Sequence, residues 1–536
     1  MSNKRNLVQE LLDRNCLITP DSYEILEDID TDTIDFDKLA NALKNEIVVT
    51  AEKLQEALSS YTEILSEGEL IEDLPMKPVD TSDIKELSSE ETKVEVKPTV
   101  KKTKKPFNPL GKRIETQIKI LQESTEQTIV EGTIDDFSKY FTSRYNQIRA
   151  ILRKRGDLSG AMQIAGVKKA TIDPQEVITI VGMVYEKRTL KSGGIMIEIE
   201  DPTGRYTVNI TAKEQELVEK AGALLNDQVA GFVGKIYDNR LFLNELIYPN
   251  VPIMDKKSNL KDPISVCMTS DLHIGSKEFL EESFLRFIDF LSGKVDDPYQ
   301  QTLASQIKYL IICGDLVDGI GIYPGQEDDL VINDIYEQYK HAAKLIAQIP
   351  KWIHVIIISG NHDACRLALP QPAFSKEYAP DLWAMENVTI LSNPSIIELH
   401  GRKVLLFHGN SFEDVSSLTP GLSMSDPNGP MIYTLRFRHL APTYGRRSSI
   451  VPSKKDELVI EIVPDLYITG HIHINSHTQY RGIDCINAGT FQSQTDYMLS
   501  KNIKPTPGRV PVFNLQTNKM HELVFYDPNE QKNEKI

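Results

Sequence analysis

The chain has 536 residues, of which 40% are hydrophobic, and it carries a formal net charge of −17. A length of this kind predicts on the order of two to four domains. No apolar stretch reaches the roughly 18 residues of a membrane-spanning helix, so we expect no contact with a membrane. The acidic balance argues against a protein that simply coats nucleic acid, although bound divalent metals can supply the positive charge that an acidic surface lacks.

The cysteines are spaced too far apart for a zinc knuckle or a disulfide framework, and no C-x-x-C pair occurs. They are Cys16, Cys267, Cys313, Cys365 and Cys485. This usage fits a reducing compartment. The opening residues, "MSNKRNLVQELLDRNC", are charged and lack the apolar core of a signal peptide. We therefore expect a cytoplasmic protein.

The first part of the chain divides into a helical module and a linker. Apolar residues at i, i+3 and i+4 spacing predict a small helical domain over 1–74. Residues 75–112 are rich in Lys, Glu, Ser, Thr and Pro, with no aromatic residue before Phe107. Such a segment cannot bury enough apolar area to order itself, which predicts a flexible linker. Its basic end, "KKTKK", is interpreted either as a solvated tail or as a contact for nucleic acid or a partner.

A helical connector is predicted over 113–170, with the clearest helical period at 134–158. Over 171–255 the pattern alternates between apolar and polar residues and is broken by the turns "SGG" and "DPTG". Three strands, a short helix and two further strands are the order of a five-stranded OB barrel, with a generic small barrel as the alternative. Such barrels bind single strands or act as subunit adaptors. Because this barrel has few aromatic residues that look exposed, the sequence favours the adaptor role at least as much as the binding of single strands.

From residue 264 onward, short apolar segments alternate with helical ones, which is typical of an α/β layered fold. The predicted strands are 264–270, 308–314, 354–360, 403–409 and 465–470, and the predicted helices include 281–293 and 333–349. A side chain able to bind metal follows the carboxyl end of each of these strands. Because ligands of open α/β sheets collect at carboxyl ends, we expect the five loops to converge on one site.

Seven residues of ligand type follow these strands: Asp271, His273, Asp315, Asn361, His408, His471 and His473. Each short motif alone is more often an ordinary hydrogen-bonded turn than a metal site. Together, however, the carboxylates, imidazoles and amide match two divalent ions, with Asp315 as the bridging carboxylate. Mixed oxygen and nitrogen ligands suit Mn²⁺, Fe²⁺ or Zn²⁺ better than Mg²⁺ or Ca²⁺. Of these three ions, we expect Mn²⁺ to be the one bound.

Two ions roughly 3.5–4 Å apart clamp a phosphate and generate hydroxide from water at neutral pH. The leaving oxygen then needs a proton, and a histidine is suited to supply it because its pKa lies near neutrality. The sequence therefore predicts a metal-dependent hydrolase of phosphate esters.

The motif series "SDLHIGS", "GDLVDG", "SGNHD", "FHG" and "TGHIH" resembles that of the calcineurin-like metallophosphoesterase superfamily. The resemblance implies one metal held by Asp271, His273, Asp315 and His473, and a second held by Asp315, Asn361, His408 and His471. It implies His362 as the proton donor, with Asp318 orienting it. Protein phosphatases of the superfamily carry an arginine after the second aspartate of "GDxxD", where this chain has Gly319. That difference argues against a phosphoprotein phosphatase and leaves room for a bulkier substrate such as a DNA end.

The resemblance extends to one family within that superfamily. The segments "RFRHLAPTYG" (436–445), "INAGTFQSQTDY" (486–497) and "KPTPGRVPVFNL" (504–515) are similar to the small subunits of archaeal family D DNA polymerases. The likeness is close over 130–525 and poor in the first hundred residues. It implies a phosphoesterase domain over 256–536 that acts as a 3′→5′ proofreading exodeoxyribonuclease on DNA 3′ ends. It also implies a heterodimer with a large catalytic polymerase subunit, and a sliding clamp as a further candidate partner.

Related eukaryotic B-subunits keep the two domains but have lost the metal ligands, so the seven intact residues favour a competent enzyme. The alternatives are a non-catalytic polymerase scaffold and a stand-alone phosphodiesterase or phosphatase. The segment 433–455 is locally basic, and its candidate DNA contacts are Arg436, Arg438, His439, Arg446 and Arg447. A positive loop of this kind tracks a DNA backbone, docks the large subunit, or is simply solvated.

Overall fold

The computed structural model describes residues 17–18, 48–49, 92–95, 107–126, 130–255 and 260–528. It divides into two units, Met1–Pro78 and Val79–Ile536. In the first unit, β1 (Leu17–Ile18) and β2 (Val48–Val49) pair in parallel. The rest of the helical domain predicted for 1–74 lies outside the described residues.

The second unit contains two large sheets that pack face to face. The seven-stranded sheet has the order β13-β12-β11-β10-β19-β20-β3. Its strands are β3 (Thr92–Glu95), β10 (Ser265–Thr269), β11 (Ile307–Cys313), β12 (His354–Ile358), β13 (Val388–Leu391), β19 (Arg509–Asn514) and β20 (Met520–Val524). The six-stranded sheet has the order β17-β18-β16-β15-β14-β4. Its strands are β4 (Ile118–Gln122), β14 (Ser395–Leu399), β15 (Arg402–Leu406), β16 (Leu466–Thr469), β17 (Ser476–Tyr480) and β18 (Ile483–Asn487).

Alternation along the buried strands explains the layering. In β11, Tyr309 and Ile311 face a core shared with the other sheet, whereas Leu310 and Ile312 face a second core under the helices. The side-chain period of 2 in a strand sends neighbours to opposite faces, so an unbroken apolar run is what a sheet covered on both faces requires.

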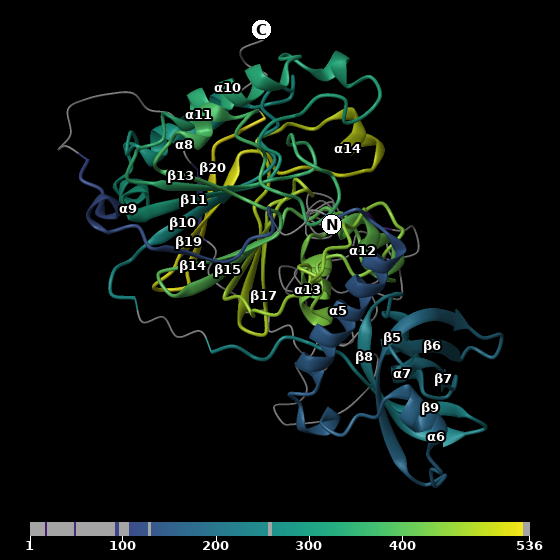
Figure 1. The fold of residues 1–536 in the computed structure, drawn as a ribbon. Helices are drawn as coiled ribbons and strands as arrows, with labels where there is room; N and C mark the ends of the chain where they lie inside the picture. The colour runs from purple at the N-terminus through teal and green to yellow at the C-terminus, as the bar shows by residue number, and fades with distance from the viewer. Residues whose placement is uncertain are drawn as a thin grey trace, which may run out of the picture. The chain divides into compact units, whose positions relative to one another are not determined.

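Helices cover both outer faces. Those against the seven-stranded sheet include α8 (Glu281–Leu291), α9 (Pro298–Gln306), α10 (Ile335–Ile346) and α11 (Pro380–Trp383) (Figure 1). Those against the six-stranded sheet are α5 (Ile134–Leu152), α12 (Phe412–Leu418) and α13 (Asn428–Phe437). The remaining short helices are η1 (Leu110–Arg113), η2 (Gly156–Leu158), α6 (Ile164–Lys169), α7 (Gln215–Gly222), η3 (Gln326–Asp329) and α14 (Asp496–Ser500). The α/β fold class predicted from the sequence is confirmed.

The five-stranded barrel predicted over 171–255 is also confirmed, with the closed order β5-β6-β7-β9-β8. The strands are β5 (Val177–Thr189), β6 (Ile195–Asp201), β7 (Gly204–Ile210), β8 (Val229–Tyr237) and β9 (Arg240–Ile247), with α7 between the third and fourth. They form one cluster in Figure 1. The barrel core continues into α12 and α13 through Val415, Tyr433 and Phe437, which attaches the barrel to the six-stranded sheet.

Two predictions about the connecting segments are wrong. The connector 113–170 is not helical throughout, because β4 forms the outer strand of the six-stranded sheet and pairs antiparallel with β14. The linker 75–112 contains β3, which pairs in parallel with β20, and η1; most of its other residues lie outside the described ranges. Both strands form on partners hundreds of residues away, and pairing of that kind overrides local pattern. In the described ranges, no helix is long and apolar enough to cross a membrane.

Candidate metal centre

The carboxyl ends of β10, β11, β12, β15 and β16 deliver the predicted ligands to one buried cluster. Three groups of side chains have ligand atoms within 4.8 Å of one another, and two of them consist of predicted ligands only: Asp271, His273 and His473 form the first, and Asp315, His408 and His471 form the second. The remaining group is His273, Asp318 and His362. Asn361 joins the second group, because its Oδ1 lies 3.1 Å from His408 Nε2. The structure therefore brings together all seven residues.

Two carboxylate oxygens lie among three imidazole nitrogens. Asp271 Oδ1 is 3.2 Å from His473 Nε2 and 3.9 Å from both His273 Nε2 and His408 Nε2. Asp315 Oδ2 is 3.2 Å from His408 Nε2 and 3.8 Å from His273 Nε2. Asp315 thus lies between one histidine of each group, as a bridging carboxylate would.

The backbone at these positions is strained. Five of the seven residues have a positive φ between 50° and 69°: Asp271, His273, Asp315, His471 and His473. This left-handed region is uncommon for residues with a Cβ and costs of the order of 1–3 kcal/mol at each position. The surrounding hydrogen bonds hold it, for example His273 N–H to Asp315 O at 3.1 Å. Strain of this kind clusters where side chains must be aimed at one point.

Two of the histidines are oriented with Nε2 directed at the cluster. His273 Nδ1 donates to Asp318 Oδ1 at 2.9 Å, and His408 Nδ1 donates to the carbonyl of Cys313 at 2.8 Å. A hydrogen bond at Nδ1 fixes the tautomer and leaves the Nε2 lone pair for a metal.

The donor set fits divalent cations. Asp271 Oδ1 and His473 Nδ1 are buried and have no hydrogen-bond partner in the described part of the chain. Burial opposes the charge of Asp271, yet His473 and His408 lower its pKa to about 2. Burial likewise disfavours protonated His408, but Asp315 and Asp271 raise its pKa to about 10. The cluster thus attracts positive charge strongly, and carboxylate, amide and imidazole ligands together suit Mn²⁺, Fe²⁺ or Zn²⁺.

The predicted link between Asp318 and His362 needs correction. The Asp318 carboxylate binds His273, whereas His362 Nδ1 donates to the backbone carbonyl of Asp318 at 2.8 Å. His362 is half-buried, and its backbone N–H donates to Asp315 Oδ1 at 2.7 Å. Its ring meets the His273 ring edge-on, with 4.5 Å between the ring centroids. The ring of His362 therefore lies beside the cluster, next to His273.

The loops around His362 pack tightly, and this explains two glycines. Gly360 has no positive φ; instead, a Cβ there would collide with the carboxylate and backbone nitrogen of Asp315. Gly319 has φ +75° and lies against the carbonyl of His362, so any side chain at 319 would displace that loop. Asp363 holds the loop, since its carboxylate accepts from Gly360 N at 2.9 Å and from the Tyr339 hydroxyl at 3.2 Å.

Sequence reasoning missed two glutamines that hold Asp318. Gln326 is fully buried and its Nε2 donates to Asp318 Oδ2 at 2.7 Å, and Gln492 Nε2 lies 3.4 Å from Asp318 Oδ1. Neither glutamine follows one of the five strands, and an amide in a polar loop gives no periodic signal. Only the folded contacts reveal them.

The basic segment is only partly accessible. Arg438 and His439 are buried, which rules out the DNA contacts predicted for them. Arg438 donates to the carbonyls of Ile460 and Glu461, and His439 Nε2 donates to Asp456 at 2.8 Å. Both residues follow the C-terminal end of α13 and bind groups in the segment 456–461 instead of solvent.

The other three predicted contacts keep some exposure. Arg436 is half-buried, whereas Arg446 and Arg447 are exposed, and Arg447 pairs with Glu413. The exposed loop reaches the metal centre, because Ser448 Oγ donates to the carbonyl of Asn410, two residues after His408.

Comparison with known proteins gives a consistent family. A family model that describes the B-subunits of DNA polymerases alpha and epsilon matches residues 266–478. The chain is 40% identical over 403 residues to the DNA polymerase II small subunit of Methanothermobacter thermautotrophicus, covering 75% of this chain and 82% of that protein.

Other relatives have the same description. The small subunit of Pyrococcus horikoshii is 42% identical over 399 residues, covering 74% of this chain and 63% of that protein. The small subunit of Archaeoglobus fulgidus is 39% identical over 396 residues, covering 74% and 78%. The chain thus matches less than two thirds of the Pyrococcus horikoshii protein but more than three quarters of the other two.

Proposed function

Because the chain belongs to the family of archaeal DNA polymerase II small subunits, we propose that it carries a two-metal 3′→5′ exonuclease of the calcineurin-like metallophosphoesterase type. A small subunit implies a large catalytic subunit, so the enzyme would act on DNA 3′ ends within that heterodimer. The observation that carries the proposal is the buried convergence of two carboxylates and three imidazole Nε2 atoms, with Asp271 Oδ1 lacking a hydrogen-bond partner in the described part of the chain.

The chain's own residues divide into two ligand sets around Asp315. Asp271, His273, Asp315 and His473 would hold one ion, and Asp315, Asn361, His408 and His471 would hold the other. When bound, two such ions supply Lewis acidity to a phosphodiester and lower the pKa of water. Mn²⁺ is our first choice, with Fe²⁺ or Zn²⁺ as alternatives.

His362 is placed to act as the general acid. The Asp318 carbonyl fixes the ring through Nδ1, so a proton on Nε2 can pass to the leaving 3′ oxygen. Its half-buried position keeps Nε2 accessible to a substrate, unlike the ligand His408, which is fully buried. Arg446 and Arg447 lie on the loop beside the centre and would bind the DNA backbone.

The test uses the heterodimer and an oligonucleotide with a mispaired 3′ end in Mn²⁺. We expect stepwise shortening by the wild type, and a loss of about 10²- to 10⁴-fold in His362→Ala with metal content unchanged. Asp315→Asn should lose both activity and metal. His341→Ala is the matched control, since His341 pairs with Glu281 on the helical face and lies outside the centre.

Two results would replace the proposal. A wild-type heterodimer that holds metal but shortens no DNA strand would point to a polymerase scaffold without nuclease activity. Hydrolysis of p-nitrophenyl phosphate esters without action on DNA would point to a stand-alone phosphatase or phosphodiesterase. Full activity in His362→Ala would overturn only the assignment of the general acid.

A further inference from the structure

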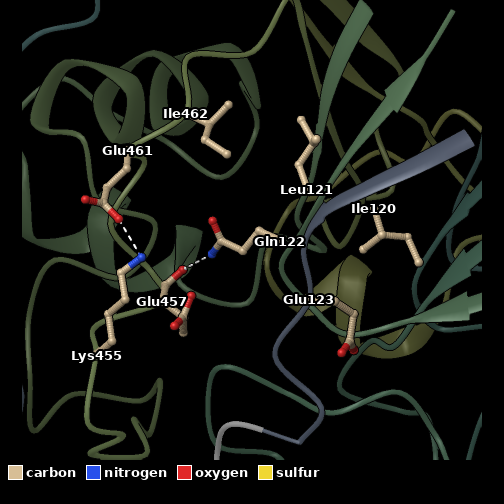
Figure 2. Close-up of a pocket in the computed structure, with 8 residues that line it drawn as sticks. All are labelled: Ile120, Leu121, Gln122, Glu123, Lys455, Glu457, Glu461 and Ile462. Atoms are coloured by element: carbon tan, nitrogen blue, oxygen red, sulfur yellow. Dashed lines mark hydrogen bonds and ion pairs between the residues drawn. The ribbon is translucent and has the colours of Figure 1, made fainter. Parts of the chain in front are cut away.

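A pocket that contains none of the seven predicted ligands lies along the open edge of β4. Among the described residues, β4 pairs only with β14, so its other edge has no strand partner. The pocket has a volume of about 340 Å³ (Figure 2). It is lined by Ile120, Leu121, Gln122, Glu123, Lys455, Glu457, Glu461 and Ile462. Side chains of consecutive strand residues point to opposite faces, so a lining of four in a row places the pocket along the edge.

The opposite wall is the segment 455–462, held to β4 by one hydrogen bond. Gln122 Nε2 donates to the carbonyl of Glu457 at 2.8 Å, as Figure 2 shows. The pocket is thus a groove with two walls, the edge of β4 and the segment 455–462. An open edge next to a preformed groove is the arrangement to which an added strand binds.

The pocket carries excess negative charge. Three carboxylates and one ammonium line it: the Glu123 carboxylate accepts from Thr125 and Ser392, and Lys455 is paired with Glu461 at 2.6 Å, which leaves Glu457 as the third carboxylate. Glu457 is only 5% exposed, and the nearby charge of Lys455, which is paired with Glu461, opposes the effect of burial on its carboxylate. Burial nevertheless raises its pKa. A largely buried carboxylate that shares its one lysine with another carboxylate is costly, so this side chain favours a further cation from outside.

An apolar patch lies beside the acidic one. Ile120 is 48% exposed, and Ile462 on the opposite wall is half-buried. An exposed β-branched side chain on an unpaired edge is normally avoided because it promotes pairing with other chains. Here it complements the acidic wall, since an extended segment can present an apolar and a basic side chain two residues apart on one face.

We propose that β4 accepts an extended segment of the large polymerase subunit as an added strand, with a lysine or arginine directed at Glu457 and an apolar residue against Ile120 and Ile462. Backbone hydrogen bonds to the edge would give affinity, and the pocket would select the basic side chain. This inference rests on the proposed heterodimer and not on the nuclease, so inactivity towards DNA would leave it standing.

The first test is amide hydrogen exchange of the full chain, alone and with the purified large subunit. We expect the amides of 118–122 to exchange at least about tenfold more slowly in the complex. Unchanged exchange in a formed complex would overturn the proposal. Protection already present in the isolated chain would also overturn it: concentration-dependent protection would indicate a second copy, and concentration-independent protection a segment of the chain itself.

The second test uses biolayer interferometry to measure affinity for the large subunit. Glu457→Gln keeps the shape and removes the charge, and Ile120→Asp removes the apolar contact; each should weaken binding by about tenfold. The matched control is Glu386→Gln, the same change at an exposed glutamate outside the pocket, which should bind as the wild type does. Wild-type affinity in both pocket variants would overturn the proposal. The exchange test uses unaltered protein and so does not depend on how the variants fold.

Discussion

Replacing Asp318 by asparagine tests how the metal centre is held in place. The carboxylate accepts from His273 Nδ1 through Oδ1, and from Gln326 Nε2 through Oδ2, at 2.9 and 2.7 Å. Asparagine has one oxygen and one NH₂ group, so it can face one donor correctly but not both. The change also removes a buried charge: burial opposes the ionised form of Asp318, but the hydrogen bond from His273 lowers its pKa.

The size of the effect follows from this mismatch. One buried donor left facing another donor costs about 1–3 kcal/mol. If the mismatch falls on His273, its ring is no longer fixed with Nε2 directed at Asp271 and Asp315. Partners that orient metal-binding histidines are typically worth about 10- to 100-fold in metal affinity, which is the same range. We therefore expect Asp318→Asn to bind Mn²⁺ about 10- to 100-fold more weakly.

Calorimetric titration of metal-free protein with Mn²⁺ measures this directly. Asp329→Asn is the control, because Asp329 lies in the same loop and loses the same charge, but it is exposed and its carboxylate accepts from Tyr323 in that loop. Asp329→Asn should bind as the wild type. If Asp318→Asn binds Mn²⁺ with wild-type affinity while keeping its fold, the hydrogen bond to His273 does not control the centre, and the reasoning fails.

Three further predictions concern stability. Removing bound metal with EDTA should lower the melting temperature, because a ligand that binds only the folded chain stabilises it; equal melting temperatures with and without Mn²⁺ would count against a metal centre. Asp456→Leu should cost about 3–5 kcal/mol in urea unfolding, since Arg144, fully buried and bonded to Asp456 at 2.7 Å, loses its partner. Arg144→Met together with Asp456→Leu should recover most of that loss, and equal losses in the single and double variants would contradict the pairing. Burial lowers the pKa of His439 from 6.5; burial also opposes the charge of Asp456, yet His439 and Arg144 hold its pKa below 3.8. Both groups therefore bind protons at a higher pH in the unfolded chain than in the folded one, so the urea midpoint should fall as the pH drops below 6.5 and further below 3.8. A His439→Asn variant whose urea midpoint has the same pH slope near 6.5 as the wild type would refute the assignment to His439.

The buried pair also shows why the basic segment was misjudged from sequence. Arg438 and His439 stand next to Arg436 in a run of positive charge, which by composition predicts a DNA-binding loop. In the fold, α13 ends at Phe437, and the two residues turn inward to bind carbonyls and Asp456. The charge of a segment does not indicate whether its side chains point to solvent or to the interior, because that depends here on where α13 ends.

Asp318 is a second example. Its spacing in "GDLVDG" correctly placed it beside the centre, but the sequence could not distinguish its carboxylate from its carbonyl as the group that meets His362. That choice depends on the positive φ of Gly319 and on Gln326, which lies eight residues on in an unpatterned loop. The edge pocket is a third, since β4 becomes a strand only by pairing with β14.

The sequence by itself determined the five strands that end at the candidate centre and the chemistry placed at their ends. Unbroken apolar runs are buried on both faces, and polar residues of ligand type directly after them lie at the sheet edge, so the convergence of the seven candidate ligands follows from local pattern alone. The tertiary structure decided everything that depends on long-range partners: which imidazole nitrogen faces the cluster, which arginines remain exposed, and which strand has an open edge. Those properties are set by contacts between residues far apart in the chain, and no local period records them.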